Sequence, residues 1–112
     1  METVLIVEDE VSTRNVLMEL LGKEGREIVT ASDGQEATER LTKLPRPRVI
    51  LLDLKMPRMA GWEFLRRQSA NPSFASIPTI VLSGSDLPAG AKHQLIKPVD
   101  IDRLRAVVDQ YC

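Results

Sequence analysis

Short runs of apolar residues that end in polar or charged residues are the feature that most constrains the fold of this chain. The two clearest runs occupy residues 4–7 and 49–52, in which every residue is apolar. An uninterrupted apolar run of this length, bounded by turn residues, is typical of a strand that is buried on both faces. Such strands belong to parallel sheets with helices on both sides. The sequence therefore predicts an α/β fold.

Two further apolar runs, at residues 79–82 and 95–96, complete this pattern, and segments with helical periodicity alternate with the runs. We expect an additional strand at 27–31, helices at 14–23, 34–43 and 101–111, and another helix that starts near residue 62. An alternation of strands and helices predicts βαβ units that build one parallel sheet.

The first predicted helix has recognisable start and core signals. Ser12 or Thr13 is expected to cap its N-terminus. The pairs Val16/Leu20 and Leu17/Leu21 lie four residues apart, so each pair shares one side of the helix and is expected to face the core.

The connection between residues 83 and 95 departs from the alternation. Only residues 84–94 separate the two runs, and they include Gly84, Pro88 and Gly90. A parallel crossover usually needs about a dozen residues or more and contains a helix. We therefore expect a short, irregular connection whose helix is shortened or missing.

Composition predicts a single domain and argues against several functional classes. A chain of 112 residues is long enough for one hydrophobic core, and we expect residues 1–112 to be one domain without an effector domain. The formal net charge is −1 and the basic residues form no dense run, so direct nucleic-acid binding is not expected. The sequence shows neither a signal peptide nor an apolar stretch long enough for a bilayer. The single cysteine, Cys112, fits a cytoplasmic location.

The predicted strand ends carry acidic residues. The run at 4–7 is followed by Glu8, Asp9 and Glu10, and the run at 49–52 by Asp53. Because the carboxyl ends of parallel strands meet at one edge of the sheet, we expect Glu8, Asp9 and Asp53 to lie together. Three neighbouring carboxylates repel one another unless a cation lies among them, and hard oxygen ligands suit Mg²⁺. The sequence therefore predicts a magnesium site.

The motifs at all the strand ends together closely resemble the receiver domain of two-component response regulators, over essentially the whole chain. The motifs are Val-Glu-Asp-Glu at 7–10, Leu-Asp-Leu-Lys-Met-Pro at 52–57 followed by Gly61, Leu-Ser-Gly at 82–84, Lys-Pro at 97–98 and Asp-Gly at 33–34. The resemblance implies a CheY-like, flavodoxin-like fold. Its doubly wound sheet has five parallel strands in the order 2-1-3-4-5.

The resemblance also implies a set of metal ligands around a phosphoacceptor. Asp53 would accept the phosphoryl group, and Asp9 and Asp53 would bind Mg²⁺ directly. The backbone carbonyl of Lys55 would complete the protein ligands. Glu8, which stands where an aspartate is often found, would act mainly through a metal-bound water.

Two further residues would contact the phosphoryl group after transfer. Lys97 would place its ammonium on one phosphoryl oxygen as a point charge, and Ser83 would hydrogen-bond another. The family carries a switch aromatic three residues before the lysine, and this chain has Gln94 there. Because the crossover is also short, two output routes stay open. Either a partner or a second copy covers the uncovered sheet surface, or residues 84–94 order on phosphorylation, which we favour.

The sequence thus predicts a phosphoryl-accepting signalling domain that takes phosphate from a phosphohistidine on a sensor histidine kinase or phosphotransfer protein. It would act as a conformational switch and not as a turnover enzyme. One alternative is a haloacid-dehalogenase-type phosphatase, which requires an aspartate where this chain has Lys55. The other is a receiver-like interaction module that works without phosphorylation, which fits Gln94 but leaves the acidic set unexplained.

Overall fold

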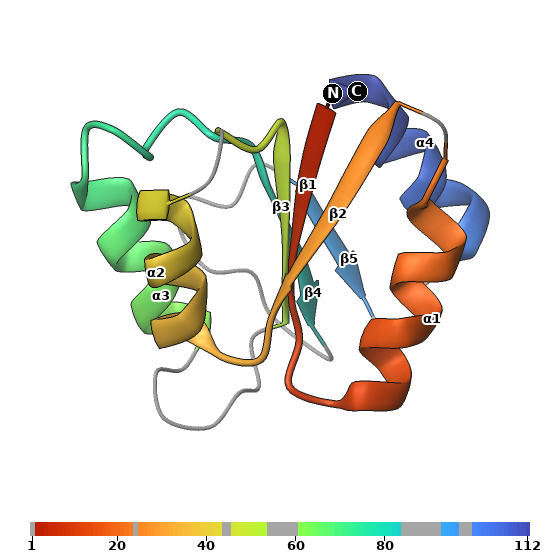
Figure 1. Cartoon of the computed structure of the whole chain (residues 1–112), viewed down its shortest axis with the longest axis horizontal. Helices are drawn as coiled ribbons and strands as arrows, with labels where there is room; N and C mark the ends of the chain where they lie inside the picture. Colours follow the sequence, from red (N-terminus) through yellow and green to blue (C-terminus); the bar gives the residue numbers. More distant parts are fainter. Residues whose placement is uncertain (1, 24, 44–45, 54–60, 84–92, 97–99) are drawn as a thin grey trace.

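The structure is one parallel sheet with helices on both faces (Figure 1). It is a computed structural model that describes residues 2–23, 25–43, 46–53, 61–83, 93–96 and 100–112. In these ranges the strands are β1 (Glu2–Val7), β2 (Arg26–Ala31), β3 (Val49–Asp53), β4 (Thr79–Ser83) and β5 (His93–Ile96). The helices are α1 (Val11–Leu21), α2 (Gly34–Lys43), α3 (Gly61–Ala70) and α4 (Ile101–Tyr111). The strand order is β2-β1-β3-β4-β5, so the predicted flavodoxin-like fold is confirmed.

Each face of the sheet has its own hydrophobic core. Figure 1 shows α1 and α4 on one side of the sheet and α2 and α3 on the other. Alternate residues of β1 point to opposite faces: Leu5 and Val7 belong to the core on the α2–α3 side, and Val4 and Ile6 to the core on the α1–α4 side. Both faces are covered, which is why the strand sequences are continuously apolar.

The first helix starts earlier than predicted. It begins at Val11, with Glu10 as its N-cap residue, and the Glu10 side chain makes no capping bond to the helix backbone. The prediction that Ser12 or Thr13 caps the helix was wrong. Both residues lie in the first turn, and their hydroxyls donate to Glu10 Oε1 at 2.9 and 2.7 Å. Residues 8–10 are enough to turn the chain from β1 into α1.

The side of α1 that faces the core was only half predicted. Leu17 and Leu21 are buried, as expected, whereas Val16 is 53% exposed. Successive helical residues are rotated by about 100° around the helix axis. The Val16/Leu20 pair is one residue earlier than the Leu17/Leu21 pair, so the two pairs point in different directions. Only the Leu17/Leu21 pair faces the sheet and α4.

The second helix begins as its sequence indicates. Asp33 Oδ1 accepts a hydrogen bond from the Glu36 N–H at 2.8 Å, which caps α2 just before its first residue, Gly34. Ala37 and Leu41 are buried on the inner side of this helix. The last helix also has its predicted bounds, 101–111.

The fifth strand is longer than predicted. It starts at His93, and Gln94 pairs with Val81 of β4, so residues 93 and 94 belong to the sheet and not to the crossover. Residues 84–92 lie outside the described residues, and the predicted loss of the crossover helix therefore stays untested. None of the helices in the described ranges is both long enough and apolar enough to span a bilayer.

The C-terminal end of α1 is held by arginine side chains from other elements. Arg26 of β2 donates from one guanidinium nitrogen to the Leu21 carbonyl and from another to Asp109 Oδ1 of α4, each at 2.8 Å. Arg105 of α4 donates to the Leu20 carbonyl at 3.3 Å. The last carbonyls of a helix have no partner within the helix, so these arginines satisfy them and tie α1 to α4.

Arg26→Met should lower the free energy of unfolding by about 1–2 kcal/mol, because the Leu21 carbonyl loses a charged donor. The Arg26 side chain is only 3% exposed, so water replaces that donor poorly. Denaturant unfolding at pH 7 measures the effect, and Arg105→Met, which removes an exposed arginine, should change stability by less than about 0.5 kcal/mol. If Arg26→Met were more stable than wild type, burial of the Arg26 guanidinium would cost more free energy than its hydrogen bonds contribute to stability.

Candidate functional site

The carboxyl ends of β1 and β3 bring three acidic side chains together. Val7 pairs with Leu52, so Glu8 and Asp53 occupy the next positions on neighbouring strands. One carboxylate oxygen from each of Glu8, Asp9 and Asp53 lies within 4.8 Å of the other two. The juxtaposition expected from parallel strand ends is therefore present, and the assignment of these residues as metal ligands stays a prediction.

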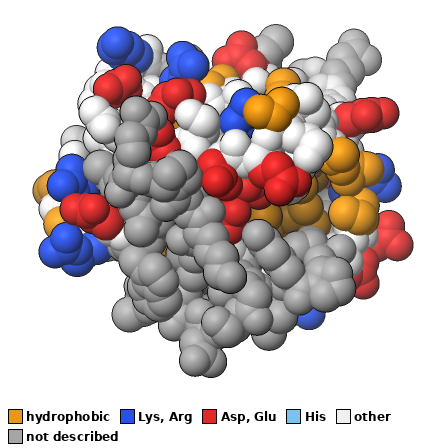
Figure 2. Space-filling view, turned by 90° about the horizontal axis from the view of Figure 1, so that it is seen from below, with side chains coloured by type: hydrophobic (Ala, Val, Ile, Leu, Met, Phe, Trp, Pro, Cys, Tyr) orange, Lys and Arg blue, Asp and Glu red, His pale blue; other side chains and the backbone are white. Residues whose placement is uncertain are grey.

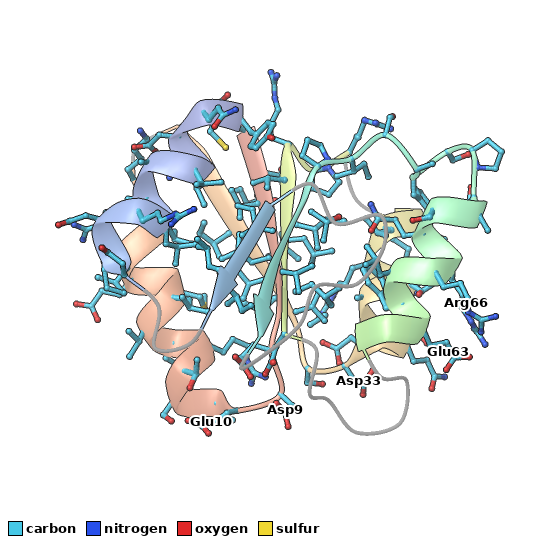
Figure 3. The ribbon with its side chains drawn as sticks, turned by 180° about the vertical axis from the view of Figure 1, so that it is seen from behind. Asp9, Glu10, Asp33, Glu63 and Arg66 are labelled. Atoms are coloured by element: carbon cyan, nitrogen blue, oxygen red, sulfur yellow. The ribbon has the colours of Figure 1, made fainter. Side chains whose placement is uncertain are left out.

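The acidic residues face one edge of the molecule. Figure 3 shows Asp9, Glu10 and Asp33 along the same edge, below the strands, whereas Glu63 and Arg66 project from the outer side of α3. Viewed onto this edge, Asp and Glu side chains gather near the middle of the face (Figure 2). Within the cluster itself, Asp9 is exposed, whereas Glu8 and Asp53 are buried.

Glu8 is the residue of the cluster in the least favourable surroundings for a charge. It is 2% exposed, and its Oε2 accepts a hydrogen bond from the Glu10 N–H at 3.3 Å. Its Oε1 is buried and has no hydrogen-bond partner in the part of the chain that the structure describes. Burial, and then the neighbouring carboxyl of Asp53, raise the pKa of Glu8 to about 8. The raised pKa favours the protonated form of Glu8 when no cation is bound.

The donor set fits a small divalent cation. A buried carboxylate oxygen without a partner is costly, and a metal ion or a metal-bound water would satisfy it. Mg²⁺ prefers oxygen ligands at about 2.1 Å, so opposite ligands in its shell lie about 4.2 Å apart. Neighbouring ligands in that shell lie about 3.0 Å apart, so oxygens that now lie within 4.8 Å of one another would move closer together when the ion binds.

The remaining predicted site residues are only partly described. Asp53 pairs with Leu82, and Ser83 pairs with Ile96, so the Ser83 backbone lies one step beyond Asp53 at the same strand edge. The side chain of Ser83 is outside the described part, as are Lys55 and Lys97, although Lys97 directly follows Ile96 in sequence. The roles of these residues stay predictions.

Sequence reasoning did not single out Arg14, which also contacts the cluster. Its guanidinium Nη1 donates to the backbone carbonyl of Glu8 at 3.0 Å. The sequence held one weak signal, since the helix dipole disfavours a cation in the first turn of a helix and Arg14 lies in the first turn of α1.

Comparisons with known proteins agree with this geometry. Residues 4–109 match the model of the response regulator receiver domain. Sporulation initiation phosphotransferase F of Bacillus subtilis is 34% identical over 116 residues, which cover 98% of this chain and 93% of that protein. A probable chemotaxis protein CheY of Rhizobium etli is 30% identical over 95% of this chain and 88% of that protein. Among solved structures, the chemotaxis response regulator CheY4 of Vibrio cholerae superposes with a TM-score of 0.86 at 30% identity, over 100% of this chain and 99% of that chain.

The stability of the metal-free protein should fall as the pH rises from about 5 to 8. The pKa of Glu8 is raised from 4.5 to about 8 in the folded state, so its contribution is complete below pH 4.5 and is lost as the pH rises through 8. One group accounts for a slope of at most about 1.4 kcal/mol per pH unit. Unfolding in EDTA at several pH values measures this slope.

Glu8→Gln is the control for this pH dependence, since glutamine keeps the shape of the protonated side chain and does not titrate. The slope between pH 5 and 8 should be smaller in the variant than in wild type. Equal slopes in the two proteins would place the titrating group elsewhere.

Proposed function

Because this chain belongs to the response regulator receiver domain family, we propose that it accepts a phosphoryl group from a phosphohistidine onto Asp53 in a Mg²⁺-dependent reaction. The observation that carries the proposal is the convergence of Glu8, Asp9 and Asp53 within 4.8 Å at the ends of neighbouring strands. Residues 1–112 would act as one signalling unit, a conformational switch that loses its phosphate slowly and not an enzyme that turns over substrate.

The position of Asp53 suits a phosphoacceptor. It is the last residue of β3, a strand buried along its whole length, and Asp53 itself is 4% exposed. A rigid strand holds the attacking oxygen in a defined direction, which lowers the entropic cost of reaction. A bond would form between this oxygen and phosphorus as the bond from phosphorus to the donor histidine nitrogen breaks, and that nitrogen would keep the bonding electron pair.

The neighbouring residues would supply the ligands for Mg²⁺. When bound, Mg²⁺ offsets the negative charge of the acceptor carboxylate and of the phosphoryl group. Asp9 and Asp53 would bind it directly, with the backbone carbonyl of Lys55 as a further ligand. Glu8, whose Oε1 is buried without a partner among the described residues, would act through a metal-bound water.

Ser83 and Lys97 would stabilise the phosphorylated form. The backbone of Ser83 lies at the same strand edge as Asp53, which supports a hydrogen bond from its hydroxyl to the phosphoryl group. Lys97 follows β5 directly, and its ammonium would contact another phosphoryl oxygen as a point charge.

The proposed donor is a sensor histidine kinase or a phosphotransfer protein. The relative from Bacillus subtilis is named a phosphotransferase, which supports a place in phosphoryl transfer. An output partner, or a second copy of the chain, would respond to the phosphorylated state. A cytoplasmic location belongs to the same proposal, since the lone Cys112 provides no disulfide framework.

Gln94 favours one alternative, a receiver-like interaction module that works without phosphorylation, because the family's switch aromatic is replaced there. Incubation with acetyl phosphate and Mg²⁺, followed by intact mass measurement, separates the two functions. A covalent phosphate adduct supports the phosphoacceptor, and its absence supports the module. Hydrolysis without any adduct would instead indicate a phosphatase.

Asp53→Asn should abolish the Mg²⁺-dependent, acid-labile phosphate adduct and leave the fold intact, because an amide oxygen is a poor nucleophile. Intact mass measurement and far-UV circular dichroism check both parts. Asp33→Asn is a matched control at the same edge of the molecule, since asparagine also caps a helix. An adduct in Asp53→Asn equal to that of wild type would overturn the assignment.

Mg²⁺ should stabilise wild type, because a cation bound only by the native state relieves the repulsion among the carboxylates. At about 100 times the dissociation constant the gain is about 2.7 kcal/mol. Thermal unfolding with Mg²⁺ or EDTA at equal ionic strength measures it. Asp9→Ala should reduce the gain more than Glu8→Ala, since Asp9 is proposed as a direct ligand. A gain that Asp9→Ala leaves unchanged would exclude Asp9 from the site.

A further inference from the structure

We propose that Arg14 is a positioning residue for the Mg²⁺ site. Its guanidinium donates to the carbonyl of Glu8 at 3.0 Å and thereby orients the peptide that joins Glu8 to Asp9. The carboxylates on either side of that peptide are two of the three that converge at the strand edge. The inference rests on the proposed function for the identity of the cation.

The turn between β1 and α1 has anchors on both sides. The Glu8 N–H donates to the Ala31 carbonyl of β2 at 3.0 Å, which extends the sheet by one residue. Beyond that bond, Arg14 holds the turn twice. Its backbone N–H donates to the Glu10 carbonyl at 2.9 Å, and its side chain donates to the Glu8 carbonyl. The Arg14 side chain therefore fixes the peptide before Asp9, whereas its backbone N–H, like that of any residue at this helical position, holds the peptide between Glu10 and Val11.

Asp9 depends on this anchoring because packing does not hold it. The Asp9 side chain is exposed, in contrast to the buried Glu8 and Asp53. The carbonyl of Glu8 and the N–H of Asp9 belong to one planar peptide, so fixing the direction of the carbonyl also fixes the plane from which Asp9 extends. Ligands must be held within about half an ångström of their working positions for a site to bind well.

The charge and the hydrogen bond of Arg14 have opposite effects on Mg²⁺ affinity. Its positive charge repels the cation, so loss of the charge alone would strengthen binding. Its hydrogen bond places Asp9, so loss of the bond weakens binding. Arg14 is only half-buried, and solvent screens its charge, whereas the geometry of the peptide is not screened. Positioning therefore outweighs repulsion.

The test is the Mg²⁺ dissociation constant, measured by calorimetry at constant ionic strength on the full chain. Arg14→Gln should bind Mg²⁺ roughly tenfold more weakly than wild type, as is usual when a residue behind a metal ligand is removed. Arg14→Lys keeps N–H donors on a long side chain that can still reach the Glu8 carbonyl, although without the fixed planar geometry, so it should show a smaller loss.

Arg105→Gln is the matched control. Arg105 also donates to a backbone carbonyl of α1, that of Leu20, but at the opposite end of the helix. The variant makes the same change in net charge and should bind Mg²⁺ as wild type does. Unfolding in EDTA measures the stability of the two glutamine variants without metal. A merely structural role of Arg14 would lower the stability of Arg14→Gln and leave its Mg²⁺ dissociation constant unchanged.

Binding by Arg14→Gln that equals or exceeds wild type overturns the inference, and so does an equal loss in Arg105→Gln. Should Arg14→Gln fail to fold, Arg14→Lys decides: weaker binding supports the inference, and wild-type binding overturns it. Wild type that binds Mg²⁺ but forms no adduct with acetyl phosphate overturns the proposed function alone. Wild type that binds no Mg²⁺ overturns both.

Discussion

Burial of β1 and β3 on both faces is the constraint on which the rest of the structure depends. Each residue of β3 is buried, and alternate residues of β1 enter different cores. A shift of one residue between the strands would exchange the two faces and move every side chain into the wrong core. The register that pairs Val7 with Leu52 is therefore strongly specified, and it places Glu8 beside Asp53.

The acidic cluster lies where this well-packed framework ends. Packing brings Glu8 and Asp53 together in a buried position, although two buried carboxylates repel each other. In the absence of a cation the raised pKa of Glu8 resolves the conflict, because the protonated side chain carries no charge. A bound cation would resolve it differently, by offsetting the negative charge. The cluster is thus an unfavourable arrangement that the two cores offset, and the proposed Mg²⁺-dependent reaction would use the carboxylates that it brings together.

The first helix connects this edge of the sheet to the last helix. At its N-terminal end Arg14 contacts the Glu8 carbonyl, and at its C-terminal end Arg26 and Arg105 contact the final carbonyls. Both ends of α1 are therefore fixed by charged donors, while its middle packs through Leu17 and Leu21. The helix thus links the acidic cluster to α4 through contacts along its whole length.

The sequence by itself determined the strand runs, their alternation with helices and the residues at each strand end, because apolar periodicity and turn residues are local properties of the chain. These features were sufficient to predict a parallel sheet and the meeting of Glu8, Asp9 and Asp53, and the resemblance to receiver domains implied the strand order. Only the tertiary structure decided that Glu10 precedes the first helical residue in place of Ser12 or Thr13, that Val16 is exposed, and that Arg14 reaches the Glu8 carbonyl. It also decided the protonation of Glu8, since a pKa depends on how far the fold excludes water from the group and on which charges it brings near. Such properties arise from contacts between elements and from solvent exclusion, which no local pattern of residues specifies.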